Sequence, residues 1–148
     1  NTYPNWEYKS TTPELIKLCI EKENEWYNSN DDYKHQDIDN ERQALLYAMN
    51  HAEEIGIKGG VLFVDGNIVA FTFGFPINHK TFGIHFEKAD INYTGAFTVI
   101  NQMFARDIPA EFEYINREED LGIEGLRKAK TSYNPAFLIT KGVITLKP

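Results

Sequence analysis

Histidine and glutamate stand two positions apart, as His85 and Glu87, in a stretch that alternates apolar and polar residues. Alternate side chains of a β-strand project to the same face, so these two are expected side by side, followed by Lys88 and Asp90. The ordinary pKa of histidine is about 6.5, which suits removal of a proton from an incoming amine. Either side chain is a candidate catalytic base. The alternative is a covered strand face on which His85 is simply hydrogen-bonded.

A second group of polar side chains follows the strand expected over residues 112–115. Rigid scaffolds place reactive groups on loops at strand ends, so this loop and the helix after it are expected to hold substrate. The alternative is an ion-paired surface helix, because four bases here meet four acids and exposed pairs are individually weak. With Lys88, the predicted substrate-binding residues are Asn116, Arg117, Glu118, Asp120, Arg127 and Lys130.

The sequence does not favour a metal site or a cysteine nucleophile. His85 and Glu87 offer at most two ligands, whereas a catalytic zinc site uses three protein ligands. Cys19, the single cysteine, lies in an apolar helical stripe with no base beside it, and buried cysteine behaves as a small hydrophobe. One cysteine excludes an internal disulfide and fits a reducing compartment, so we expect a cytoplasmic protein.

Two helices are expected near the start of the chain. Thr12 followed by proline is typical of a helix start. The polar run 28–32 predicts the loop that ends this helix. Asp39 is the expected cap of a second helix, which Gly56 stops. Before both helices, the alternation over Trp6–Lys9 predicts an edge strand.

The rest of the chain switches to strand patterns. Asp65-Gly66 between two apolar runs predicts a hairpin over residues 61–73, because a tight turn needs positive φ angles. The full order is βααβββαβαββ, an α+β or α/β layered domain on one mixed sheet. The later elements are expected as a strand over 82–87, a helix over 96–104, a strand over 112–115, a helix over 123–130, and strands over 136–139 and 143–146 with Gly142 at the turn.

Composition and charge limit the classes of function that the chain can have. The chain has 148 residues, 42% of them hydrophobic, enough for one globular domain with its own core. No apolar run nears the ~20 residues that cross a bilayer, and no signal peptide is evident, so we expect a soluble protein. The net charge of −7 arises between Glu14 and Glu54, where 11 acids face 4 bases. This surplus of acids argues against a broad surface for duplex nucleic acid.

The order of elements resembles the GCN5-related N-acetyltransferase (GNAT) fold. The runs 60–71, 85–90 and 114–130 are similar to the family of the C-terminal domain of phosphatidylglycerol lysyltransferase. The resemblance covers nearly all of residues 1–148 and implies a mixed, mostly antiparallel sheet flanked by helices. It also implies two such domains in tandem, with this chain as the C-terminal half and a GNAT-like domain before it as the missing partner.

The resemblance also suggests a place for a cofactor. Acetyltransferases of this fold hold the pyrophosphate of coenzyme A on backbone N–H groups where the helix after the fourth strand begins. The corresponding turn here is Thr94, Gly95 and Ala96, with Asn92 at the first position of the motif and Phe97 at the last. An ordinary helix start capped by Thr94 is the alternative.

Donor and acceptor stay open at this stage. Family members that use aminoacyl-tRNA need no coenzyme A, so acetyl coenzyme A and an aminoacyl-tRNA, whose ester lies at the RNA 3′ end, are both candidate donors. Tyr133, one turn after Ala129, is the general acid that the resemblance implies; packing of its ring is the alternative. The acceptor is expected to be an amine or hydroxyl of a small molecule or a lipid.

Two functions follow from these observations. The first is acyl or aminoacyl transfer in a polar crevice where neighbouring strands part around Glu87 and Asn116. The second is a non-catalytic partner domain that stabilises another half through an apolar patch near Trp6 and Tyr8. The fold does not decide between them, because function resides in the site.

Overall fold

The hairpin at Asp65-Gly66 is the centre of the sheet. In the computed structural model, β2 (Lys58–Val64) and β3 (Asn67–Asn78) pair antiparallel across this turn, where Asp65 has a φ of 48° and Gly66 of 79°. Both angles lie in the left-handed region that a two-residue hairpin turn requires. The hairpin prediction is therefore confirmed.

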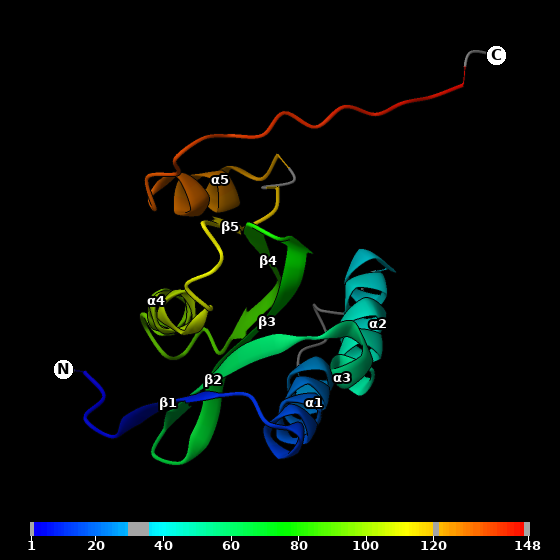
Figure 1. Cartoon of the computed structure of the whole chain (residues 1–148). Helices are drawn as coiled ribbons and strands as arrows, with labels where there is room; N and C mark the ends of the chain where they lie inside the picture. Colours follow the sequence, from blue (N-terminus) through cyan, green and yellow to red (C-terminus); the bar gives the residue numbers. More distant parts are fainter. Residues whose placement is uncertain (1, 30–35, 120–121, 147–148) are drawn as a thin grey trace. The chain divides into compact units, whose positions relative to one another are not determined.

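Three further strands complete a five-stranded sheet in the order β1-β2-β3-β4-β5 (Figure 1). β1 (Trp6–Ser10) pairs antiparallel with β2, and β4 (Thr81–Ala89) antiparallel with β3. β5 (Tyr114–Asn116) runs parallel to β4 and is only three residues long. The structure describes residues 2–29, 36–119 and 122–146, which divide into two units, Asn1–Asn116 with the sheet and Arg117–Pro148.

The first two helices lie between β1 and β2 in the chain, and one of their two predicted caps is found. Thr12 caps α1 (Pro13–Ser29) as predicted, since its Oγ1 accepts the N–H of Leu15 at 3.2 Å. α2 (Gln36–Asn50) places Asp39 inside the helix, so the prediction that Asp39 caps it is wrong. The Asp39 carboxylate instead accepts the Tyr27 hydroxyl of α1 at 2.6 Å. The expected loop over residues 30–32 lies outside the described residues.

A short helix, α3, and the helix α4 complete the first unit. α3 (Ala52–Ile55) follows α2 and ends at Gly56, whose φ of 71° is the left-handed C-cap predicted from the sequence. α4 (Ala96–Asp107) leads from β4 towards β5, and it begins and ends within a few residues of the predicted range.

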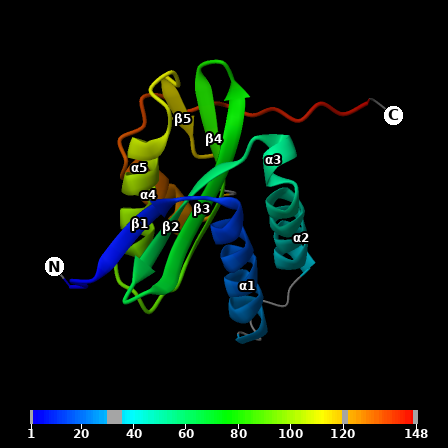
Figure 2. The same cartoon turned by 60° about the horizontal axis from the view of Figure 1, so that its bottom comes forward.

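Helices cover both faces of the sheet (Figure 2). α1 and α2 lie on what we call the α1–α2 face, where Cys19, Leu45 and Met49 pack against Phe71 and Phe73. α4 lies on the opposite side, the α4 face. Its buried residues pack against two groups of strand residues, with Ile100 against Leu62, Val64, Val69 and Ala70, and Phe104 against Phe82 and Ile84.

Two hydroxyl groups of β1 hold the end of α4. The carboxylate of Asp107 accepts the hydroxyls of Tyr8 at 2.9 Å and of Ser10 at 2.6 Å. Burial first, and this carboxylate second, raise the pKa of the Tyr8 phenol well above its ordinary value. Gly60 makes room for the ring, because a Cβ there would lie 2.3 Å from the Tyr8 oxygen.

In the second unit, one helix is followed by an extended tail. α5 (Glu124–Thr131) matches the helix predicted over 123–130. The two strands predicted over 136–139 and 143–146 are wrong: residues 135–146 contain no strand. A strand exists only where a neighbour pairs with it, and no described strand pairs with this tail. Its large apolar side chains, Phe137, Leu138, Ile139, Val143, Ile144 and Leu146, are exposed, Ile144 completely.

Replacing Tyr8 by phenylalanine tests the link between β1 and α4. Tyr8→Phe keeps the ring over Gly60 but removes one of the two donors to Asp107. We expect the free energy of unfolding to fall by about 1 kcal/mol, measured by urea denaturation. Tyr47→Phe is the matched control, since Tyr47 is 64% exposed. Equal urea midpoints for Tyr8→Phe and wild type would contradict the link.

Candidate functional site

β4 and β5 run together over three residue pairs, and β5 then ends. The last pair is Gly83 with Asn116, whereas β4 continues to Ala89. Among the described residues, no strand pairs with residues 84–89 on the β5 side of β4. A strand edge of this kind is a place where an extended molecule can add to a sheet. The crevice expected where two strands part around Glu87 and Asn116 stays a prediction.

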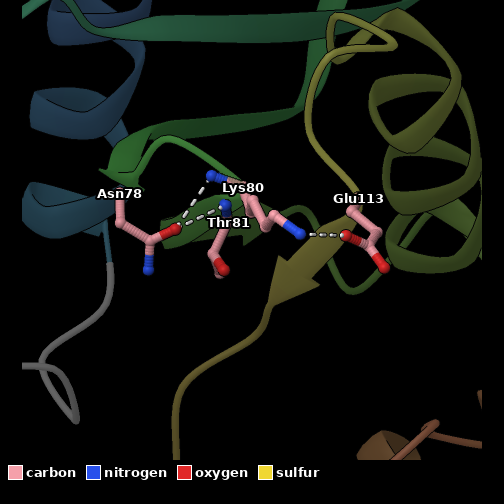
Figure 3. A network of polar contacts seen from close by, with 4 residues as sticks. All are labelled: Asn78, Lys80, Thr81 and Glu113. Carbon is pink, nitrogen blue, oxygen red and sulfur yellow. Dashed lines mark hydrogen bonds and ion pairs between the residues drawn. The ribbon is translucent and has the colours of Figure 1, made fainter.

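A polar network fixes the start of β5 (Figure 3). Asn78 Oδ1 accepts the N–H groups of Lys80 at 2.9 Å and Thr81 at 3.0 Å, which closes the turn between β3 and β4. The Lys80 ammonium lies 3.2 Å from the Glu113 carboxylate, and the Lys80 carbonyl accepts the N–H groups of Glu113 and Tyr114. The register of β5 on β4 is therefore set at this turn.

A β-bulge at His85 turns β4 at the place where β5 stops pairing. Phe73 pairs with Phe86 and Gly74 with Ile84, which leaves His85 as an extra residue. Its ring stacks on Phe75 with a centroid distance of 3.8 Å. Bulges bend a strand and increase its local twist, so the course of β4 changes just after the segment that pairs with β5.

Two glycines allow this bulge. A Cβ on Gly74 would lie 2.0 Å from the Gly83 carbonyl oxygen, and a Cβ on Gly83 would lie 2.8 Å from His85 Nε2. The neighbour of Gly74 is backbone, which cannot move aside, so the close approach of β3 and β4 requires glycine at position 74. The neighbours of Gly83 are side chains, His85 and Ile77, which would have to shift to accommodate a Cβ.

The bulge places His85 and Glu87 on opposite faces of the sheet, so the expectation that they lie side by side is wrong. Glu87 pairs with Thr72, which points to the α4 face, whereas His85 stacks on Phe75 on the α1–α2 face. Asn116 pairs with Gly83 and shares the face of His85. The candidate groups thus lie on both faces of the sheet, and not side by side on one face.

Lys88 belongs to an ionic cluster on the α1–α2 face. Its ammonium lies 2.8 Å from the Glu41 carboxylate of α2. Glu23 of α1 is only 6% exposed, and burial raises the pKa of its carboxyl, while the cations of Lys88 and Arg42 lower it by less. The Arg42 guanidinium in turn donates to Asn24 and lies over the Tyr27 ring. The role of Lys88 in holding substrate stays a prediction.

In the second unit, α5 anchors the loop that follows β5. The Lys130 ammonium donates to the backbone carbonyls of Arg117, at 2.7 Å, and of Glu119. Between them, Glu118 has a φ of 58°, a left-handed conformation that costs of order 1 kcal/mol for a residue other than glycine. The Arg117 guanidinium lies 4.9 Å from the centre of the Tyr133 ring. Lys130 is therefore a structural anchor of this loop.

The remaining predicted residues are only partly placed. Arg127 is exposed on α5, and Asp120 lies outside the described residues. Burial raises the pKa of the Cys19 thiol to about 12, which agrees with an inert core cysteine. Within the described ranges no three His, Cys, Asp or Glu residues are grouped so as to hold a metal ion, and no helix there has the length and hydropathy of a membrane span.

The turn before α4 does not fit the pyrophosphate of coenzyme A. Gly95, with a φ of 87°, is the N-cap, and no side chain caps the helix, so the expected Thr94 cap is wrong. The Thr94 N–H donates to the Tyr3 hydroxyl at 3.2 Å, and the Ala96 N–H to the Tyr93 carbonyl at 3.0 Å. Two of the N–H groups that a phosphate would need are thus already used.

A pocket of about 300 Å³ lies beside this turn. No charged residue lines it, and aromatic rings of the chain's start and of the turn form part of its wall. An uncharged lining favours an uncharged, largely apolar occupant, because burial of an unpaired charge is costly. The lining residues are Thr2, Tyr3, Trp6, Leu62, Val64, Val69, Tyr93, Thr94, Gly95, Ala96 and Val99.

Solved structures show which class of fold this arrangement defines. A possible acetyltransferase from Clostridium difficile 630 matches with a TM-score of 0.65 and 13% identity, over 97% of this chain and 98% of that one. The ribosomal-protein-alanine N-acetyltransferase of Brucella melitensis biovar Abortus 2308 matches with a TM-score of 0.64 and 13% identity, over 96% and 99%. The chain therefore has the α+β fold of the GNAT acetyltransferases.

Within this class, the chain belongs to the family of the phosphatidylglycerol lysyltransferase C-terminal domain, which it matches over residues 2–141. A conserved protein of unknown function from Bacteroides thetaiotaomicron VPI-5482 is 54% identical, with a TM-score of 0.88 over 93% of this chain. The match covers 47% of the Bacteroides protein, so the present chain spans about half of its length. None of the curated proteins matches the chain.

Sequence reasoning missed three features of the site. The bulge at His85 was not expected, although Gly74 and Gly83, inside two adjacent strands, are a recognised signal for one. The contact of Tyr3 with Thr94 joins residues 91 positions apart, and no local pattern reports such a pair. The anchoring of the loop after β5 by Lys130 is missing from the prediction, because the sequence offers Lys130 as a substrate-binding or ion-paired residue and shows no backbone acceptors for it.

The buried carboxyl of Glu23 makes stability depend on pH. Its folded pKa lies above the ordinary value of 4.5, so the folded state binds more protons and loses stability as pH rises from that value through the raised one. We expect Glu23→Gln to raise the melting temperature at neutral pH and to change it less at pH 4. Glu21→Gln, at an exposed position of the same helix, should have no effect at either pH. A Glu23→Gln shift independent of pH would contradict this.

Proposed function

We propose that this chain is an acyl-transfer domain that acts along β4 beyond the end of β5. An activated acyl or aminoacyl ester binds beside residues 84–89, and an amine or hydroxyl acceptor attacks its carbonyl carbon. The single observation that carries the proposal is the edge of β4 over residues 84–89, which no described strand covers on the β5 side. Its N–H groups can bind an extended donor and stabilise the oxyanion that forms on attack.

The two faces of the sheet supply different groups to the reaction. His85 and Asn116 lie on the α1–α2 face, and Glu87 on the α4 face. Because candidate groups lie on both faces, donor and acceptor can approach the edge of β4 from opposite sides. One base, His85 or Glu87, takes the proton that the acceptor loses as the new C–N or C–O bond forms. The ester oxygen leaves with a proton, and the assignment of Tyr133 as the donor of that proton stays a prediction of the resemblance.

The family supports transfer and also implies a larger protein. Its description names a phosphatidylglycerol lysyltransferase, whose C-terminal part this chain matches. Since the chain spans about half of the Bacteroides protein, we propose that a GNAT-like domain before it is its partner. The acceptor is proposed to be a small molecule or a lipid that carries the amine or hydroxyl group.

Binding and single substitutions test transfer in a protein that contains both halves. We expect an aminoacyl-adenosine amide, a stable analogue of the ester, to shift the amide resonances of residues 84–89. Glu87→Gln and His85→Gln are each made, and the one that removes the base should lower kcat about 100-fold or more. Glu53→Gln, on α3 and exposed, is the matched control. If neither acetyl coenzyme A nor the analogue binds, the proposal fails.

A non-catalytic partner domain is the second candidate, and one observation favours it. Trp6 is 39% exposed on β1, the open edge of the sheet, and lines the uncharged pocket. This candidate predicts that the isolated chain self-associates in analytical ultracentrifugation and that Trp6→Ser restores a monomer. Phe97→Ser, which removes another exposed aromatic ring, is the control and should leave association unchanged. A monomeric wild-type chain excludes this candidate.

A further inference from the structure

Two N–H groups at the start of α4 already donate to groups of the chain itself. A helix N-terminus binds anions through N–H groups that have no partner within the helix. Here the Thr94 N–H donates to the Tyr3 hydroxyl, and the Ala96 N–H to the Tyr93 carbonyl. An incoming phosphate would have to displace the Tyr3 hydroxyl before it reached the first of these groups.

The Tyr3 hydroxyl is held in place and does not reach the turn by chance. Its ring packs against the buried cluster between the sheet and α4, and lies 5.4 Å from the Tyr93 ring. Two residues later, Asn5 is fixed to the hairpin turn: its side-chain amide donates to the Asp65 carboxylate at 2.8 Å, and its carbonyl accepts the Asp65 N–H at 3.1 Å. The segment before β1 is therefore held at Tyr3 and at Asn5.

A negative charge and a bulky ring at the turn also oppose the binding of phosphate. The Asp90 carboxylate accepts both the backbone N–H and the side-chain amide of Asn92 at 2.9 Å, so a negative charge already sits in the loop. A second anion nearby would be repelled. Phe97, in the first turn of α4, adds a half-exposed ring where the coenzyme A motif has a small residue.

We propose that Tyr3 is a built-in plug of the α4 N-terminus, which closes to phosphate the turn that would otherwise hold coenzyme A. Its consequence for the donor rests on the transfer proposed above: the donor of that reaction is held without phosphate contacts at residues 94–96. A thioester of coenzyme A is thereby excluded as a donor bound through its pyrophosphate. The acyl group must arrive on a carrier that contacts the β4 edge by other means.

Amide resonances of the whole chain test the plug directly. Inorganic pyrophosphate and coenzyme A are titrated to millimolar concentration against wild type, Tyr3→Phe and Tyr93→Phe. Tyr3→Phe keeps the packed ring and removes only the acceptor for the Thr94 N–H. Tyr93→Phe removes a hydroxyl from the other ring of the same pair and is the matched control. The readout is the shift of the Thr94, Gly95 and Ala96 amides.

Each outcome decides the proposal. We expect no saturable shift in wild type or Tyr93→Phe, and saturable shifts in Tyr3→Phe. Tyr3→Phe should thus bind pyrophosphate at least about tenfold more tightly than wild type does. Tyr3→Phe with Asp90→Asn should bind more tightly still. Saturable wild-type shifts, or a Tyr3→Phe variant as silent as wild type, would overturn the plug. The amides of residues 84–89 report the transfer site separately, so a failure there counts against the proposed function and leaves the plug standing.

Discussion

One extra residue in β4 governs the geometry of the candidate site. Gly74 permits the close approach of the β3 and β4 backbones beside His85, and Gly83 leaves room for the imidazole. The bulge lies two residues after the last residue of β4 that pairs with β5, and it places His85 and Glu87 on opposite faces of the sheet. The distribution of the polar candidate groups over the two faces thus has a local cause.

Local patterns in the sequence predict the elements of this fold well. The Asp65-Gly66 turn, the Thr12 cap and the Gly56 stop each depend on neighbours within a few residues, and the structure confirms all three. Asp39 was misread because its carboxylate is used by another helix, a contact that a one-dimensional pattern does not contain. The tail beyond Asn134 was misread because alternation reports β propensity, whereas a strand also needs a paired neighbour.

The candidate site is harder to predict than the fold, because the register of the strands decides which of its residues share a face. Spacing placed His85 and Glu87 together, and one bulge separates them. The turn before α4 illustrates the same limit at longer range. Gly95 has a left-handed conformation with a φ of 87°, yet the hydroxyl of Tyr3, 91 positions before Thr94, accepts the Thr94 N–H group. Fold membership is secure, and the chemistry depends on such contacts.

The extended tail affects the tendency of the protein to aggregate. Phe137–Ile139 and Val143–Leu146 are short, β-branched or aromatic-rich runs that carry no charge, separated only by Thr140, Lys141 and Gly142. Exposed segments of this kind stack with identical copies into cross-β arrays, and a single lysine is a weak gatekeeper. Burial of these side chains against another apolar surface therefore removes an aggregation-prone segment from solvent.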